Sequence, residues 1–400
     1  MANLIPLPTA RYAILFVAAA AIMGCSRSVD RSRLTSLAST REFGFRLFAQ
    51  LASDSAAENV VISPIAVEMC LAMAANGAGG KTKAEIVTAL GHELDSINRA
   101  NATLLRSLPV SRGPVKLTLA NSLWGREGLQ FAKQFLSLCG RDYSATARTL
   151  DFASPSAARE INNWAARKTK GLIPNIVNNL RPTDVALLLS AVCFHGKWAK
   201  PFSPPYTHAS RFHLIDGKRV ERQMMYHYEE FGCLQTDSFS AVALPFANRR
   251  FCMYVFVPDD TLGLPKFLKK LNDDNWRRWT AEFETAEIVV GLPRFTIEYA
   301  ASLKGPLSAL GIESAFDSRH ADFKPMVAES PVQPVWFGDA RHKAHIEVDE
   351  AGARAVAVMA LSAVGGAPDE VIADRPFFLA ISDTWSGAIL FMGAVYDPPQ

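Results

Sequence analysis

The spacing of apolar residues in the first half of the chain predicts helices. Four large apolar side chains recur at helical spacing within residues 41–52, which is typical of an amphipathic helix. Residues 64–76 are apolar on almost every side, so we expect that helix to be buried. Residues 157–179 also have a helical pattern, with an end expected near Gly171.

Strand patterns dominate the second half. The first half also contains two predicted strands. Residues 115–123 alternate between apolar and polar, and residues 186–194 form a continuous apolar run. Further strands are expected at residues 241–245, 251–257, 287–299, 376–381 and 388–396, and a helix at residues 303–310. Helices come first and strands later, with few β-α-β alternations, which favours an α+β fold.

Composition and charge are those of a large globular domain. The chain has 400 residues, of which 49% are hydrophobic and 20% are charged, enough for a sizeable core. The pattern is continuous from about residue 35, so we expect one domain over residues 35–400. A net charge of +3 without a dense Lys/Arg block argues against nucleic acid as a partner.

The N-terminus has the features of an export signal. Arg11 precedes an apolar stretch at residues 12–23, which is short for a membrane span. Residues 22–25 (IMGC) resemble the lipobox of bacterial lipoproteins, which implies a signal peptide at 1–24, lipidation of Cys25 and a polar tether at 25–34. By the same resemblance Ser26 favours an outer-membrane or periplasm-facing anchor. A secretory signal cleaved nearby is the alternative.

Five cysteines remain after Cys25, without CxxC spacing, which favours buried free thiols over a disulfide framework or a zinc site. One bridged pair stays open as an alternative.

Catalytic motifs are incomplete. Residues 76–82 (NGAGGKT) resemble a phosphate-binding loop, but Ala75 stands where the motif needs glycine. His342 and His345 lack the glutamate of a metal-binding HExxH motif, and no GxSxG occurs. We therefore expect no enzyme, no cofactor and no metal site.

Residues 347–376 combine an acidic start, a row of small side chains and a Gly-Gly-Ala-Pro break. Such a row is too small to fill a core, but it can slide between two existing strands without clashing. This segment predicts a protein that works by changing shape.

Nine segments, in order and at family spacing, resemble the serpin family between about residues 36 and 398. They are residues 59–64, 76–86, 119–123, 194–202, 292–295, 310–316, 342–352, 374–377 and 391–393. The resemblance implies one domain with three β-sheets, eight or nine helices and an exposed reactive-centre loop at about residues 350–375.

The resemblance also implies a function. A serpin inhibits serine proteases, and in some cases cysteine proteases, irreversibly. The protease cuts the loop, is trapped as an acyl-enzyme, and is carried along as the loop inserts into the central sheet. The partner is then a protease in covalent complex with a monomeric inhibitor. The alternative is a non-inhibitory binding protein with the same fold, cleaved as a substrate.

The hinge of the loop is implied at Glu350, Gly352, Ala353, Ala355 and Ala357. Because side chains alternate along a strand, the three alanines and Met359 would point inward on insertion, and all of them are apolar. Arg354 departs from the family pattern, but its side chain would point outward on insertion and its charge would remain in water.

Family spacing of sixteen residues after Glu350 places the reactive bond at Gly366–Ala367, with Val364–Gly365 and Gly365–Gly366 as alternatives. No Arg, Lys, Phe or Leu lies there, so a trypsin-like target is not expected, and an elastase-like or subtilisin-like target is favoured, with a cysteine protease as the alternative.

The same resemblance implies sheet-opening roles for Trp198, Ser63, Ser190 and His342. Ser190 stands where the family usually has Asn, and Ala66 where it usually has Ser. We expect fewer hydrogen bonds beneath the opening strands.

Overall fold

The computed structural model describes residues 31–54, 57–108, 113–181, 184–329, 334–350 and 369–399, with side chains from Thr40 onward. The expected hinge residues 352–357, the reactive bond at 364–367 and the lipidation site at Cys25 lie outside the described residues.

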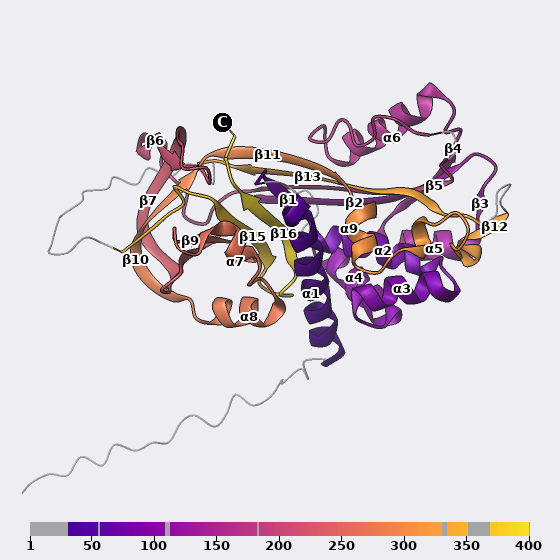
Figure 1. Cartoon of the computed structure of the whole chain (residues 1–400), viewed down its shortest axis with the longest axis horizontal. Coiled ribbons are helices and arrows are strands. Elements are labelled where there is room, and N and C mark those ends of the chain that lie inside the picture. Colours follow the sequence, from indigo (N-terminus) through magenta and orange to yellow (C-terminus); the bar gives the residue numbers. More distant parts are fainter. Residues whose placement is uncertain are drawn as a thin grey trace, which may run out of the picture.

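Nine α-helices lie within the described ranges, and most of them gather on one side of the strands (Figure 1). They are α1 (Arg31–Asp54), α2 (Pro64–Asn76), α3 (Gly80–Leu90), α4 (Leu94–Ser107), α5 (Lys133–Tyr143), α6 (Pro155–Lys168), α7 (Gly263–Leu268), α8 (Asp273–Ala281) and α9 (Lys304–Ala309). α6 lies apart from the others, across the strands (Figure 1).

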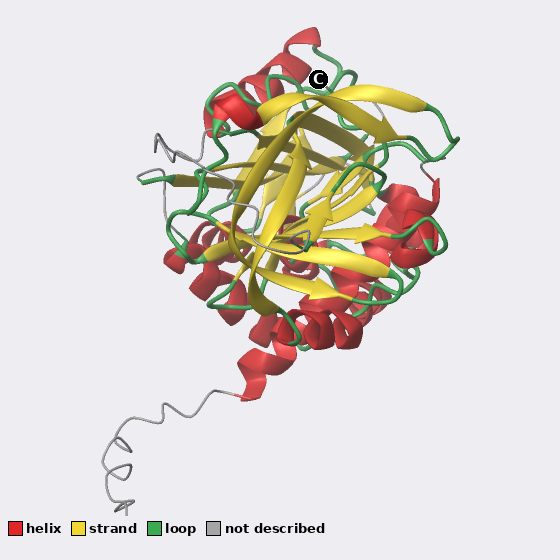
Figure 2. Ribbon diagram, turned by 90° about the vertical axis from the view of Figure 1, so that its left-hand side faces the viewer, coloured by secondary structure: helices red, strands yellow, loops and turns green. Residues whose placement is uncertain are grey.

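Within the described residues, the largest sheet has nine strands. Its order is β1 (Val60–Ile62), β16 (Ile389–Val395), β15 (Phe377–Asp383), β9 (Phe251–Pro258), β8 (Phe239–Pro245), β7 (Arg219–Gln235), β10 (Glu284–Pro293) and β14 (Glu370–Ile372), and β6 (Thr207–His213) pairs with β7. Figure 2 shows the strands in the middle of the domain, with helices around them.

A second sheet has five strands and carries the candidate site. Its order is β11 (Phe295–Ser302), β13 (Phe337–Val348), β5 (Ala186–Gly196), β2 (Val115–Arg126) and β4 (Thr146–Leu150). A third, two-stranded sheet pairs β12 (Val327–Glu329) with β3 (Gln130–Phe131).

β5 is covered on both of its faces. Its alternate residues Leu187 and Leu189 pack with Trp164 of α6, whereas Leu188 and Val192 belong to the main core. α2 contacts β5 and β2 from that core side. A strand covered on both faces needs a continuous apolar run, which is what residues 186–194 provide.

The α+β class, the three sheets and the nine helices agree with the prediction. The helix predicted from residue 157, with its end expected near Gly171, ends at Lys168, because Lys170 (φ 54°) and Gly171 (φ 88°) adopt left-handed backbone conformations that end a helix. One boundary was wrong. The single strand predicted at 287–299 is two strands in different sheets, since the chain crosses over at Arg294, whose N–H donates to the Gln223 carbonyl at 2.8 Å.

Candidate functional site

The candidate site is the seam between β13 and β5. These neighbours run parallel over nine residue pairs, from Phe337 opposite Ala186 to Ile346 opposite Phe194. On either side the neighbouring pairs, β11 with β13 and β5 with β2, are antiparallel. A strand that folded back from the end of β13 into this seam would therefore be antiparallel to both neighbours. That arrangement suits a loop continuous with β13.

Trp198 holds the end of β13 where such a strand would enter. Its indole is buried, and its Nε1–H donates to the Asp349 carbonyl at 2.8 Å, one residue beyond β13. The ring stacks on Phe246 with centroids 4.6 Å apart. Gly196 permits this stack, since a Cβ there would lie 2.6 Å from the Phe246 ring.

Glu350 is the last described residue before the loop. Its carboxylate lies 3.7 Å from the Arg294 guanidinium. A cavity of about 290 Å³ opens here, lined by residues 294–296 and 347–350. Trp198 and Arg294 thus fix the two residues from which the loop departs.

A row of polar side chains crosses the sheet beneath the seam. Asn121, Ser190 and His342 lie opposite one another on β2, β5 and β13. Ser63, which precedes α2, donates its backbone N–H to His342 Nε2 at 3.0 Å. Sequence reasoning brought Ser63, Ser190 and His342 together but missed Asn121.

Hydrogen bonding in this row is incomplete. Among the described protein atoms, the side-chain oxygens of Ser63, Ser190 and Asn121 and the Nδ1 atom of His342 have no partner. Burial lowers the pKa of His342 to about 3, so the imidazole is neutral at physiological pH. With Nε2 accepting from Ser63, the proton sits on Nδ1 and lacks an acceptor. A buried polar group left unpaired destabilises the closed sheet.

The other face of the seam is covered by the segment that follows α6. Lys343 on β13 donates to the Asn175 carbonyl at 3.1 Å and pairs with Glu298 at 3.1 Å. A cavity of about 280 Å³ lies between this segment and the sheet, with Thr169 and His345 in its lining. Lys343 therefore fastens the covering segment to one of the two strands that would separate.

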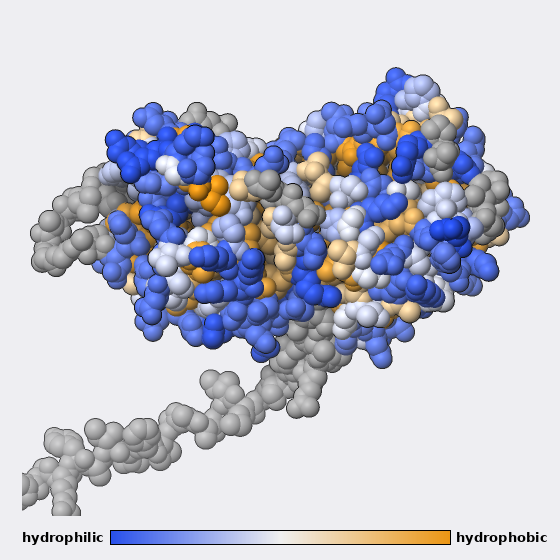
Figure 3. All heavy atoms as spheres, in the orientation of Figure 1, coloured by the Kyte–Doolittle hydropathy of each residue, from blue (hydrophilic) through white to orange (hydrophobic). Residues whose placement is uncertain are grey.

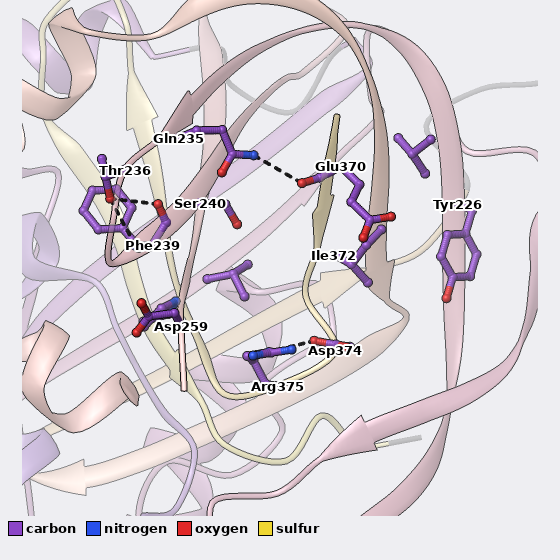
Figure 4. A pocket seen from close by; sticks show the side chains of 13 residues that line it. Tyr226, Gln235, Thr236, Phe239, Ser240, Asp259, Glu370, Ile372, Asp374 and Arg375 are labelled. Atoms are coloured by element: carbon purple, nitrogen blue, oxygen red, sulfur yellow. Dashed lines mark hydrogen bonds and ion pairs between the residues drawn. The ribbon is translucent and has the colours of Figure 1, made fainter. Parts of the chain in front are cut away.

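The far end of the loop is held by β14. This three-residue strand pairs in parallel with β10 at the edge of the large sheet. Gln235 Nε2 donates to the Glu370 carbonyl at 3.2 Å, and Arg375 pairs with Asp374, beside a cavity of about 530 Å³ (Figure 4). Residues 349–369 thus connect two fixed ends.

The phosphate-loop resemblance has a structural explanation. The Gly79 N–H donates to the Asp322 carbonyl at 2.8 Å, and a Cβ at Gly79 would lie 2.5 Å from Asp322 Oδ2. A carboxylate therefore already occupies the start of α3, where a phosphate would have to bind. No cluster of three or more metal-binding side chains occurs among the described residues.

Comparison with known proteins identifies the class. Residues 38–398 match the family model Serpin (serine protease inhibitor). The chain therefore belongs to the serpin family, as its motifs predicted.

Individual relatives support the assignment to the serpin family. Leukocyte elastase inhibitor of Xenopus tropicalis is 30% identical, over 89% of this chain and 97% of its own length. The thermophilic serpin tengpin in its native state superposes with a TM-score of 0.83 at 29% identity, covering 90% of this chain and 94% of tengpin. Thyroxine-binding globulin in complex with thyroxine superposes with a TM-score of 0.83 at 23% identity, over 91% of this chain and 99% of that chain, and shows the fold alone. The relatedness supports protease inhibition and a protease as the class of partner.

The prediction of a plain non-enzyme needs correction. The matched family is described as serine protease inhibitors, and a relative is named leukocyte elastase inhibitor. The chain is therefore grouped with inhibitors that act on proteases, a class that the plain prediction of a non-enzyme did not name.

Proposed function

We propose that this protein inhibits a serine protease irreversibly, by inserting its cleaved loop between β13 and β5. The observation that carries the proposal is the parallel seam itself, with Trp198 fixing the residue where the connection of residues 349–369 begins. Insertion would replace one parallel ladder of nine pairs by two antiparallel ladders. The gain in hydrogen bonds and apolar contacts drives the change of shape.

The proposed chemistry begins as ordinary proteolysis. The protease serine Oγ bonds to the carbonyl carbon of the reactive-bond residue, the peptide C–N bond breaks, and the leaving amine takes up the serine proton. Insertion then removes the acyl ester from its hydrolytic geometry, so the ester persists. The reactive bond is proposed at Gly366–Ala367, with Val364–Gly365 and Gly365–Gly366 as alternatives, all outside the described residues.

The target is proposed to be elastase-like or subtilisin-like. Glycine and alanine offer no cation or large ring to a deep specificity pocket. The relatedness to leukocyte elastase inhibitor supports the same class.

A second candidate is a serpin-fold binding protein that is cut without trapping the protease. The departures from the family pattern at Ser190 and Ala66, beneath the strands that would have to separate, are the observation that favours it. In this candidate cleavage leaves the loop outside the sheet.

The protein is further proposed to be a monomer, exported and anchored through a lipid on Cys25. The apolar stretch at 12–23 and the residues IMGC support the anchor. Among the described residues no helix is long and apolar enough to cross a bilayer.

The test mixes the chain beginning at Ser26 with an elastase-like protease and follows it by denaturing gel and mass spectrometry. A covalent complex, with a released peptide beginning at or beside Ala367, is the expected result. The Ala353→Arg variant would place a charge in the inward row, which is expensive to bury, and should be cleaved without forming a complex. Clean cleavage of the unaltered chain with no complex would favour the second candidate instead.

A further inference from the structure

One face of the domain combines the start of α1, a group of exposed cations and an exposed tryptophan. α8 lies along the lower edge of the domain in Figure 1, and the first turns of α1 project below that edge. We call this face the base, and define it as α7, α8, the turn at residues 383–387 and the first turn of α1 (residues 31–34). The first described residue, 31, lies at the base.

The base is basic. Its exposed cations are Lys266, Lys269, Lys270, Arg277 and Arg278, on α7, on α8 and between them. Within the described part of the chain none of these five forms an ion pair, so their charges face solvent. In Figure 3 hydrophilic residues cover the lower edge where α8 lies.

Nearby carboxylates offset this charge only in part. Asp273, at the start of α8, is buried and forms an ion pair with Arg41 of α1. Asp274 and Glu282 are exposed at the two ends of α8. Between residues 266 and 278 five cations therefore oppose one unpaired carboxylate.

Trp385 adds an apolar group to the base. Its side chain is 77% exposed, at the tip of the turn between β15 and β16. The turn is tied to α8, because Arg41 donates to the Gly387 carbonyl at 3.2 Å while it pairs with Asp273. Arg41 thus ties the turn that carries the indole to the start of α8.

The turn holds the indole outward. Asp383 is fully buried and paired with Arg250, and its carboxylate also accepts from the Ser386 hydroxyl at 2.8 Å. The Arg250 guanidinium lies 4.9 Å from the centre of the Trp385 ring, which supports one face of the indole. The other face is left to solvent in the described structure.

We propose that the base docks on the surface of an anionic lipid bilayer, with Trp385 at the level of the headgroups. Tryptophan concentrates at membrane interfaces because its ring is apolar and its N–H is polar. Clustered Lys and Arg side chains are attracted to anionic lipids over about one Debye length. The described part of the chain begins at the base with α1, and the apolar stretch at 12–23 precedes it in the sequence.

A bilayer fits the base better than a soluble polyanion does. A soluble polyanion would bind the cations alone. A bilayer would bind the cations and also accommodate the Trp385 indole among its headgroups. The five-stranded sheet lies on the opposite, upper side in Figure 1. Docking at the base would therefore leave the seam between β13 and β5 accessible to a protease.

The test measures binding of the chain beginning at Ser26 to lipid vesicles by sedimentation. This chain lacks the apolar stretch and Cys25 but keeps every buried core residue, since the core extends from Phe43 to Tyr396. Vesicles of phosphatidylcholine containing phosphatidylglycerol are compared with vesicles of phosphatidylcholine alone, at low ionic strength. We expect binding to the anionic vesicles, with a blue shift of tryptophan fluorescence.

Two base variants and one matched control make the test specific. The double variant Lys269→Gln/Lys270→Gln removes two charges and should lower vesicle affinity by roughly twenty-five-fold, at about fivefold per cation. Trp385→Ser should lower affinity and abolish most of the blue shift. The control Arg167→Gln/Lys168→Gln removes two exposed charges at the end of α6, across the domain, and should leave binding unchanged.

The proposal is overturned if the anionic vesicles do not bind, or if the control lowers affinity as much as the base variant does. Binding of a sulfated polysaccharide without binding of vesicles would also overturn it and assign the cations to a polyanion. Protease trapping in solution, without vesicles, should be the same for Trp385→Ser and the unaltered chain, so failure of this proposal is distinct from failure of the inhibitory one.

Discussion

Glu68 on α2, the helix beneath the seam, gives a quantitative prediction. Its carboxyl is 2% exposed; Asn101 Nδ2 donates to it at 2.9 Å and the Thr40 hydroxyl at 3.4 Å. Burial raises its pKa from 4.5 to about 7, and these two hydrogen bonds offset only part of the shift.

The pKa difference fixes the sign and size of a pH effect. Between about pH 4.5 and pH 7 the unfolded chain has lost this proton while the folded chain keeps it. The folded state therefore binds more protons, and the free energy of unfolding falls as pH rises through this range. The contribution of Glu68 to this fall in the free energy of unfolding is at most about 3 kcal/mol.

Glu68→Gln should remove this pH dependence. A glutamine still accepts from Asn101 and can donate to the Thr40 oxygen, so packing is preserved. Urea unfolding at about pH 5 and about pH 8 would show the unaltered chain losing up to about 3 kcal/mol more than the variant between the two conditions. An identical loss in both proteins would refute the assignment of a neutral buried Glu68.

Three variants test the contacts around the seam. Trp198→Phe keeps the ring stack but removes the hydrogen bond to Asp349, and should lower the free energy of unfolding by about 1 kcal/mol in thermal or urea melts. Lys343→Met frees the Asn175 carbonyl and should speed loop insertion, seen as faster formation of covalent complex; an unchanged rate would mean that this contact does not limit insertion. Ser190→Asn supplies an amide to the unpartnered polar row and should raise the stability of the uncleaved form by about 1 kcal/mol, with an unchanged melting curve as the contrary result.

The sequence predicted much of the fold because its strongest patterns are local. The buried helix at 64–76 and the strand at 186–194 could be placed because burial on all sides demands continuous apolar runs. The crossover at Arg294 could not be predicted, since strand propensity does not indicate where a chain leaves one sheet for another.

The candidate site was predictable only through its resemblance to a family. Trp198 donates to a backbone carbonyl 151 residues away, a contact that no local pattern encodes. Asn121 was missed although a signal existed. Its side chain is on the same face of the strand as the core residues Leu117 and Leu123. A polar residue among apolar ones on that face was the signal.

The most direct test of the central claim is the melting temperature of the chain before and after its loop is cut by a protease that is not trapped. Insertion between β13 and β5 would add a strand to the five-stranded sheet, so we predict a large upward shift after cleavage. A cleaved protein that melts at the same temperature as the intact one would contradict the account, because the loop would then lie outside the sheet.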